Sequence, residues 1–305
     1  MAVTTNQVRA RAGGDAVWVV VRPLWAGFQF TRRWPVIPLF IIGVLLFTAI
    51  FAPWLEPYDP IDNQNAYLRP PAWTAEGTRA FIFGTDDVGR DILSRMIEAS
   101  RITVVVVLIA VTTGMVSGTI LGLLAGYFGG SLLDEAVMRI VDVWAALPQL
   151  LILLAIALVF GQGYVVLIAS LALISWPGAV RLVRVEALKL RKMDYVDMAR
   201  ISGASNGRIL YRHILPGVVN TVLVSATLST GSLIMAEATL SFLGAGVPAP
   251  NPSLGGMIAT GREWLRDAPH LASFPGLAVA LIVMAGNFLG DWMRDRFDPR
   301  LRQVS

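Results

Sequence analysis

Cysteine is absent from the 305 residues, and charged side chains make up only 15% of them. The lack of cysteine excludes disulfide bonds, thiolate metal sites and cysteine nucleophiles. The two histidines, His213 and His270, are too few for a histidine-rich metal site. A soluble domain normally carries about a quarter charged residues, so this chain does not have the composition of one.

Lysine is as scarce as histidine, because the positive residues are 23 arginines and 2 lysines. Neither Lys189 nor Lys192 stands in the G-x-x-x-x-G-K-[ST] pattern of a nucleotide-binding P-loop. We therefore expect no cofactor and no metal on this chain, and we expect any ATP with its Mg²⁺ to be bound by a partner. The net charge of +4 indicates membrane orientation rather than a nucleic-acid partner.

Apolar residues are abundant and make up 55% of the chain. A helix that crosses a bilayer needs roughly 20 mostly apolar residues. Six runs meet that requirement, which predicts an all-α membrane protein. The predicted spans are 36–55, 102–127, 140–161, 164–182, 218–243 and 274–292. The first follows Arg32 and Arg33, and is expected to be a retained signal anchor rather than a cleaved signal peptide.

The basic residues are distributed unevenly between the loops. With the N-terminus inside, 18 of them lie inside and 7 outside, as the positive-inside rule favours. We therefore expect both termini in the cytoplasm. Tryptophans and arginines in 16–34 indicate a helix lying on the inner membrane face. The segments between spans are a cytoplasmic N-terminal segment at 1–35, external loops at 56–101 and 244–273, a cytoplasmic loop at 183–217 and a cytoplasmic tail at 293–305.

A polar stretch at 194–216, which we call the elbow, interrupts the apolar pattern. Residues 194–202 predict a short helix with one apolar side. Gly203 is expected to be the left-handed residue that ends this helix, and Ser205 is expected to cap the next one. The elbow therefore consists of two short helices that meet at an angle.

The second helix of the elbow is expected to stop at Pro216, because proline cannot continue the hydrogen-bonding pattern of a helix. Its apolar face carries Ile209, Leu210 and Ile214. A small elbow with one apolar stripe has a shape that docks into a groove on a partner. It is equally the shape of a structured connector between two spans, and physical reasoning alone leaves both interpretations open.

The run D-M-A-x-x-x-G at 197–203, followed by nine residues and H-I-L-P, resembles the EAA loop of ATP-binding-cassette (ABC) importer permeases. That loop reads E-A-A-x-x-x-G-x9-I-x-L-P. This chain departs from it at Asp197, Met198 and His213. The resemblance implies that the elbow couples the permease to an ATPase. The coupling residues would be Asp197, Met198, Ala199, Arg200, Gly203, Ala204 and Ser205.

The run FGTDDVGRDILSRMIEASR at 83–101, the external block, resembles the G-T-D-x-x-G-R-D-x-x-S-R block of dipeptide, oligopeptide and nickel transport permeases. Thr85 or Asp86 is predicted to cap an amphipathic helix in it. Its charged residues either hold the segment together or touch a substrate-delivering protein. They are Asp86, Arg90, Asp91 and Arg95.

These resemblances imply a type I ABC importer permease fold in the cell membrane of a prokaryote, and a chain that is not itself an enzyme. The implied partners are a homologous second permease subunit, two cytoplasmic ATPase subunits, an extracytoplasmic substrate-binding protein and membrane lipid. The implied function is to form the path for di- or oligopeptides. Nickel or another small solute is the alternative cargo.

Two intramembrane features leave alternatives open. Glu237, inside the fifth apolar run, either lines a translocation path or bonds a neighbouring helix. Four glycines spaced four apart, at 114, 118, 122 and 126, allow close helix contact within the chain or with a second subunit. An ion-coupled secondary transporter would show paired halves and several midplane ionisable residues. A membrane enzyme would show a catalytic motif, and the sequence has neither.

Overall fold

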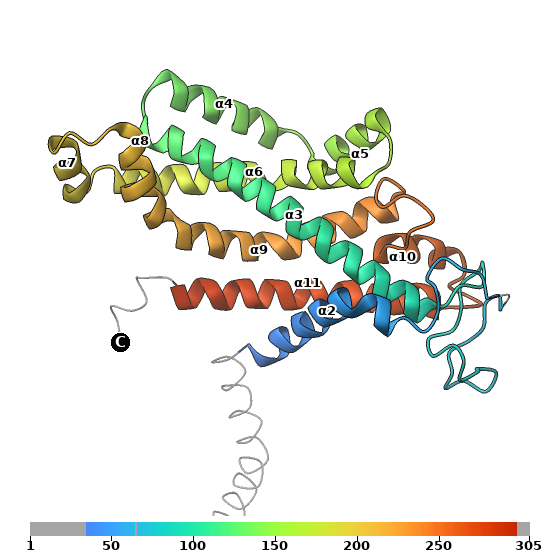
Figure 1. Cartoon of the computed structure of the whole chain (residues 1–305). Coiled ribbons are helices and arrows are strands. Elements are labelled where there is room, and N and C mark those ends of the chain that lie inside the picture. Colours follow the sequence, from blue (N-terminus) through green and yellow to red (C-terminus); the bar gives the residue numbers. More distant parts are fainter. Residues whose placement is uncertain (1–34, 65, 298–305) are drawn as a thin grey trace, which may run out of the picture.

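The computed structural model describes residues 35–64 and 66–297, where every regular element is helical (Figure 1). The predicted inner-face helix in 16–34 and the end of the predicted tail lie outside these residues. In chain order the elements are α2 (Val36–Leu55), α3 (Ile92–Tyr127), α4 (Leu132–Ala146), α5 (Gln149–Phe160), α6 (Tyr164–Leu190), α7 (Asp194–Ile201), α8 (Asn206–Ile209), the π-helical turn η1 (Leu210–Ile214), α9 (Leu215–Phe242), α10 (Leu254–Glu263) and α11 (His270–Phe297).

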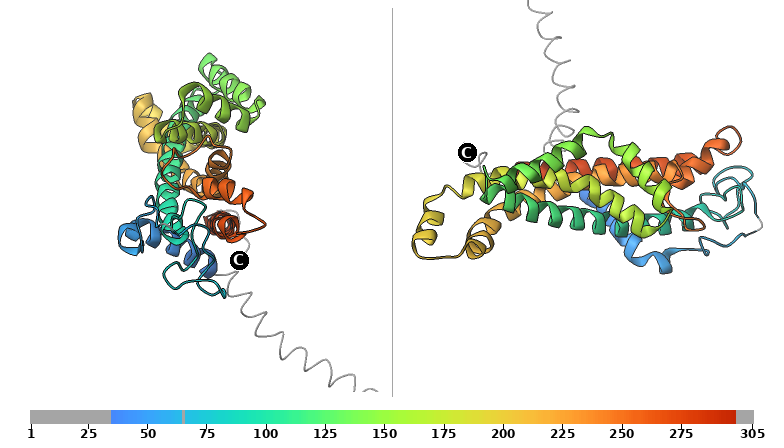
Figure 2. Two further views of the ribbon diagram at one scale, coloured as in Figure 1. Left: turned by 90° about the vertical axis from the view of Figure 1, so that its right-hand side faces the viewer. Right: turned by 90° about the horizontal axis from the view of Figure 1, so that it is seen from above.

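The longest helices, α3, α6, α9 and α11, run along the length of the molecule (Figures 1 and 2). The elbow lies at one end, which is also where α11 ends, and the loop after α2 lies with α10 at the other. Helix α3 has 36 residues, which corresponds to about 54 Å. The hydrocarbon core of a bilayer is about 30 Å thick, so α3 extends beyond it.

Five helices are long and apolar enough to cross a membrane, and a sixth span is present if α4 and α5 are counted together. The prediction of one span over 140–161 is wrong in form, because α4 and α5 meet at an angle of 90°. The break lies at Leu147 and Pro148, which both have extended backbones. A residue before proline is driven out of the helical conformation by the proline ring, and this explains the position of the bend.

Helix α3 also begins earlier than predicted. The amphipathic helix expected in the external block and the span expected from residue 102 form one unbroken helix that starts at Ile92. Its cap is Asp91, whose side chain accepts from the backbone N–H of Ser94, so the expectation of a cap at Thr85 or Asp86 is wrong. A single rigid helix therefore connects the external block to the other end of the molecule.

The four evenly spaced glycines lie in the contact between α3 and α6, which is the most extensive helix contact in the described chain. A Cβ atom at Gly118 would come within 2.5 Å of the Cβ of Ala179 on α6, and one at Gly126 within 2.6 Å of the Cβ of Ala187. Side chains at these positions would force the two helices apart. The stripe thus serves packing within the chain, one of the two alternatives.

Candidate functional site

Helix α7 turns Val196 and Ala199 inward and several larger apolar side chains outward. Val196 is fully buried, whereas Tyr195, Met198 and Ile201 are 45%, 64% and 82% exposed. Beside them Arg200 donates to Asp197 at 2.8 Å in an exposed ion pair. The outward face of α7 is therefore an apolar surface, which we call the docking face and define as Tyr195, Met198 and Ile201.

The turn after α7 has the geometry predicted for Gly203 and Ser205. Gly203 has φ +80°, and its N–H bonds the carbonyl of Arg200 at 3.1 Å, while the N–H of Ala204 bonds that of Ala199 at 3.0 Å. This pair of bonds is a Schellman motif, which closes a helix through a left-handed residue. Ser205 Oγ then accepts from the N–H of Arg208 at 3.4 Å and caps α8. Both local predictions are confirmed.

The apolar stripe predicted for docking faces the interior instead. Ile209 and Ile214 are fully buried and Leu210 packs against the same cluster. We call this cluster the elbow core; it lies between the elbow, α3 and α6 and is separate from the main core of the molecule. Its buried members are Leu123, Tyr127, Val183, Ala187, Val196, Ile209, Ile214 and Val218. The elbow is thus fixed to the chain by its apolar stripe, and the docking face is what remains outside.

The helix does not stop at Pro216. Helices α8 and α9 are joined through η1, and Pro216 lies in the first turn of α9. A proline inside an α-helix lacks the N–H donor and its ring clashes with the carbonyl four residues before. The wider π turn adds one residue per turn at that point and gives the ring room. The prediction of a helix end at Pro216 is therefore wrong, and the elbow continues directly into a long helix.

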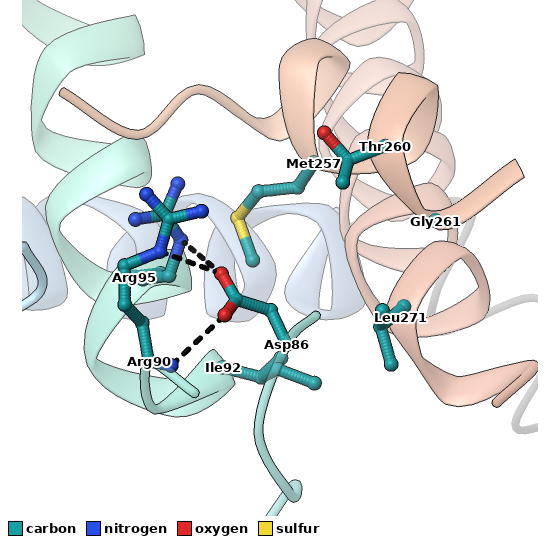
Figure 3. A pocket seen from close by; sticks show the side chains of 8 residues that line it. All are labelled: Asp86, Arg90, Ile92, Arg95, Met257, Thr260, Gly261 and Leu271. Atoms are coloured by element: carbon teal, nitrogen blue, oxygen red, sulfur yellow. Dashed lines mark hydrogen bonds and ion pairs between the residues drawn. The ribbon is translucent and has the colours of Figure 1, made fainter. Parts of the chain in front are cut away.

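At the opposite end, the charged residues of the external block are held by contacts within the chain (Figure 3). Asp86 accepts from the side chain of Arg90 at 2.8 Å and lies 3.5 Å from Arg95 Nε. Arg95 also donates to the carbonyl of Pro60 at 2.9 Å. Asp91 caps α3, and burial raises its pKa although the hydrogen bonds from Ser94 oppose that shift.

Some of these side chains line a small cavity together with residues of α10 and α11. Its volume of about 20 Å³ leaves room for one water molecule and not for a peptide. Contact with a substrate-delivering protein stays a prediction for the block, whereas its internal bonding explains why so many charges are placed there. The lining residues are Asp86, Arg90, Ile92, Arg95, Met257, Thr260, Gly261 and Leu271.

Glu237 lies on α9 and is only 1% exposed. Its Oε2 accepts from the hydroxyl of Thr103 on α3 at 3.1 Å, and its Oε1 accepts from Ser241 at 2.8 Å. Both carboxylate oxygens are therefore occupied by contacts inside this chain. This geometry is that of a bond between neighbouring helices, and a role in the translocation path stays a prediction.

Sequence reasoning missed one contact at the elbow. The hydroxyl of Tyr127, at the end of α3, donates to Asn206 Oδ1 at 2.7 Å. The two residues are 79 positions apart, and without the fold nothing in the chain pairs them. The available signal was weak: a tyrosine that ends an apolar run just before two glycines, with an asparagine at the start of α8.

Comparison with known proteins gives two family matches and a similar solved structure. Residues 118–303 match the model of the binding-protein-dependent transport system inner membrane component, and residues 30–71 match the N-terminal transmembrane domain of oligopeptide transport permease C. The fold is similar to a chain of the inward-facing MetNI methionine ABC transporter, with a TM-score of 0.50 and 19% identity over 67% of this chain and 93% of that one.

Curated relatives cover nearly the whole chain. The di/tripeptide transport system permease protein DppC of Pseudomonas aeruginosa is 38% identical over 88% of each chain. The glutathione transport system permease protein GsiD of Pectobacterium atrosepticum is 40% identical over 92% of this chain and 93% of its own. The dipeptide permease DppC of Haemophilus influenzae is 36% identical over 93% and 96%. The ion-coupled and enzymatic alternatives are thereby set aside. The chain is a multi-pass membrane protein that belongs to the family of binding-protein-dependent transport system inner membrane components, the ABC importer permeases.

Proposed function

We propose that this chain forms part of the translocation path of an ATP-driven importer for di- or oligopeptides. The proposal is supported by the names of its relatives, which are permeases for dipeptides, di/tripeptides or glutathione. All three cargoes are short peptides. The alternative cargo, nickel or another small solute, has no counterpart among these relatives.

The importer would contain four further parts: a homologous second permease, two ATPase subunits and a substrate-binding protein on the outer side. ATP and Mg²⁺ would be bound by the ATPase subunits, because the sequence offers no P-loop. The chain itself would then catalyse nothing and would change conformation in response to its partners.

The docking face on the elbow supports the part of the proposal that concerns contact with the ATPase. Met198 and Ile201 are large apolar side chains that project from a short, well-closed helix, and such surfaces mark protein contacts. A groove on the ATPase would take up these side chains, with the ion pair between Asp197 and Arg200 at the rim. The turn at Gly203, Ala204 and Ser205 would keep α7 at a fixed angle. Closure of the ATPase pair upon ATP binding would displace the elbow as one body and switch the helices between discrete arrangements.

The test is reconstitution of the chain in lipid with its second permease and its ATPase subunits. Binding proteins loaded with a dipeptide, with glutathione or with Ni²⁺ are added in turn, and ATP hydrolysis is measured. We expect the peptide-loaded proteins to stimulate hydrolysis and to deliver labelled peptide into the vesicle. Stimulation by the nickel-loaded protein alone would assign the alternative cargo.

Contact with the ATPase is tested separately. Because the chain has no cysteine, Met198→Cys introduces a unique thiol that can carry a photoreactive cross-linker. We expect a product with an ATPase subunit. The matched control is Val143→Cys on α4, which is equally exposed at 66% but lies away from the elbow, and no ATPase product is expected from it.

A further inference from the structure

Three parts of the molecule meet at Tyr127, the last residue of α3. Its ring is buried in the elbow core, and its hydroxyl donates to Asn206 Oδ1 at the start of α8 at 2.7 Å. Its carbonyl accepts from Arg191 Nη1, at the end of α6, at 2.9 Å, and the same nitrogen lies 3.2 Å from the carbonyl of Gly129. One residue thus connects α3, α6 and the elbow.

On one side of this junction the structure is stiff. The glycine stripe brings α3 and α6 so close that added Cβ atoms would collide with the facing helix. Arg191 further joins the two helices, because its cation bonds the carbonyl of Tyr127 at the end of α3, where a helix favours positive charge, and that of Gly129 in the turn that follows. The pair of α3 and α6 is therefore a firm support at this end.

On the other side the elbow continues through η1 into α9, and it packs on α3 and α6 mainly through apolar side chains. Val196, Ile209 and Ile214 lie in the elbow core. The hydrophobic effect stabilises their burial but does not depend on the direction of their contacts. A hydrogen bond depends on both distance and angle. Asn206 is exposed and begins α8, which continues through η1 into α9, and its bond to Tyr127 adds a directional contact between the elbow and α3.

We infer that Tyr127 and Asn206 are positioning residues for coupling: their hydrogen bond sets the angle of the docking face relative to α3 and α6, so that movement of the ATPase reaches these helices. The inference rests on the proposed function. Without the bond, the docking face still binds the ATPase, but the angle between the elbow and α3 is no longer fixed. Part of each ATPase movement then does not reach α3 and α6. ATP hydrolysis then continues with less transport.

The experiment measures peptide transported per ATP hydrolysed in the complete reconstituted importer. Tyr127→Phe keeps the buried ring and removes the hydroxyl, and Asn206→Leu removes the acceptor at an exposed position. A net hydrogen bond of this kind corresponds to roughly a two- to tenfold effect, and we expect a decrease of that size in each variant. The double variant should be no worse than either single variant, because both remove the same bond.

Asn206→Asp provides the rescue, because a carboxylate accepts from the tyrosine hydroxyl equally well and is favoured at a helix start. We expect a wild-type ratio. Tyr211→Phe is the matched control, since Tyr211 is 76% exposed on the same elbow, and it should leave the ratio unchanged. A wild-type ratio in both Tyr127→Phe and Asn206→Leu, or an Asn206→Asp variant as poor as Asn206→Leu, would overturn the inference.

The cross-link from Met198→Cys separates the inference from the proposed function. If the cross-link to the ATPase forms and the two variants couple normally, the inference alone is wrong. If the cross-link does not form in an otherwise unaltered importer, the proposed contact is wrong and the inference is overturned with it. A lower melting temperature with an unchanged ratio would likewise overturn the inference, because it would assign the bond to stability only.

Discussion

Glu237 on α9 accepts a hydrogen bond from Thr103 on α3 at 3.1 Å, and so joins two helices through a carboxylate that is almost completely enclosed. Glu237→Gln keeps an oxygen acceptor, and its amide can donate to a rotated hydroxyl. We therefore expect peptide uptake within about twofold of wild type. Uptake lost in a stably assembled Glu237→Gln importer would instead place the carboxylate in the translocation path.

Glu237→Leu is the contrasting variant, because it leaves the hydroxyls of Thr103 and Ser241 buried without their acceptor. Unsatisfied buried polar groups cost about 1–3 kcal/mol each. We expect a clear decrease in the melting temperature of the complex in nanodiscs. Equal stability of the Leu and Gln variants would contradict the bonding role.

Gly203 has a left-handed backbone at φ +80°, while a Cβ at this position would meet nothing within 4 Å. Gly203→Ala should therefore cost only the backbone strain of about 1–2 kcal/mol. Gly203→Trp should still assemble, because its ring points into open space, but should abolish cargo-stimulated ATP hydrolysis by blocking the docking face. Assembly is checked by gel filtration, and hydrolysis by phosphate release.

Gly207 offers a control for this prediction, because it also has no atom near its Cβ position and lies in helix α8. Alanine is favoured over glycine inside a helix, so Gly207→Ala should leave coupling intact. Normal cargo stimulation in Gly203→Trp would show that the turn is not part of the contact.

Asp86 holds the external block together, because it pairs with Arg90 and lies close to the buried Arg95. Asp86→Ala removes the carboxylate that faces these two cations. Breaking a buried ion pair lowers the free energy of unfolding by about 3 kcal/mol or more. We expect a lower melting temperature of the complex. Asp62→Ala, at an exposed position of the same loop, should have little effect, and equal effects of both variants would argue against the internal role.

The stability of the protein should also depend on pH through Glu56, which follows the last residue of α2. Burial raises its pKa to about 7, helped by Glu98 and Asp59 and opposed by Arg101. A raised pKa favours the protonated form in the folded protein, so this contribution is complete below about pH 4.5 and is lost as the pH rises through 7. Melting temperatures measured between pH 5 and 8 should decrease because of this residue.

Glu56→Gln mimics the protonated form and should remove that part of the pH dependence. At pH 8 the variant should be more stable than wild type, whereas at pH 5 the two should be similar. Parallel curves for the two proteins across this range would contradict the prediction.

Residues close together in the sequence were sufficient to predict the turn of the elbow. Gly203 and Ser205 act through their own backbone and the nearest N–H groups, so their roles follow from residue type. The bend at Pro148 was readable in the same way, because proline restricts the residue before it. The prediction of one straight span followed the length of the apolar run instead. It was wrong because it gave no weight to the effect of Pro148 on Leu147.

Contacts between distant residues could not be predicted. The inward direction of Ile209 and Ile214 depends on α3 and α6 being present to receive them, and an apolar stripe alone does not say whether its own chain or a partner covers it. The bonds from Tyr127 to Asn206 and from Thr103 to Glu237 depend likewise on how the helices are placed. Residue type identified Glu237 as unusual but did not identify what it meets.

Helix α3 runs unbroken from its cap at Asp91 to the junction at Tyr127. If the elbow takes up movement from an ATPase as proposed, a tilt passed to α3 at Tyr127 would also displace the external block at the other end of this helix. The end proposed to receive energy and the end proposed to meet a substrate-delivering protein would then be joined by one helix, and no separate relay would be needed between them.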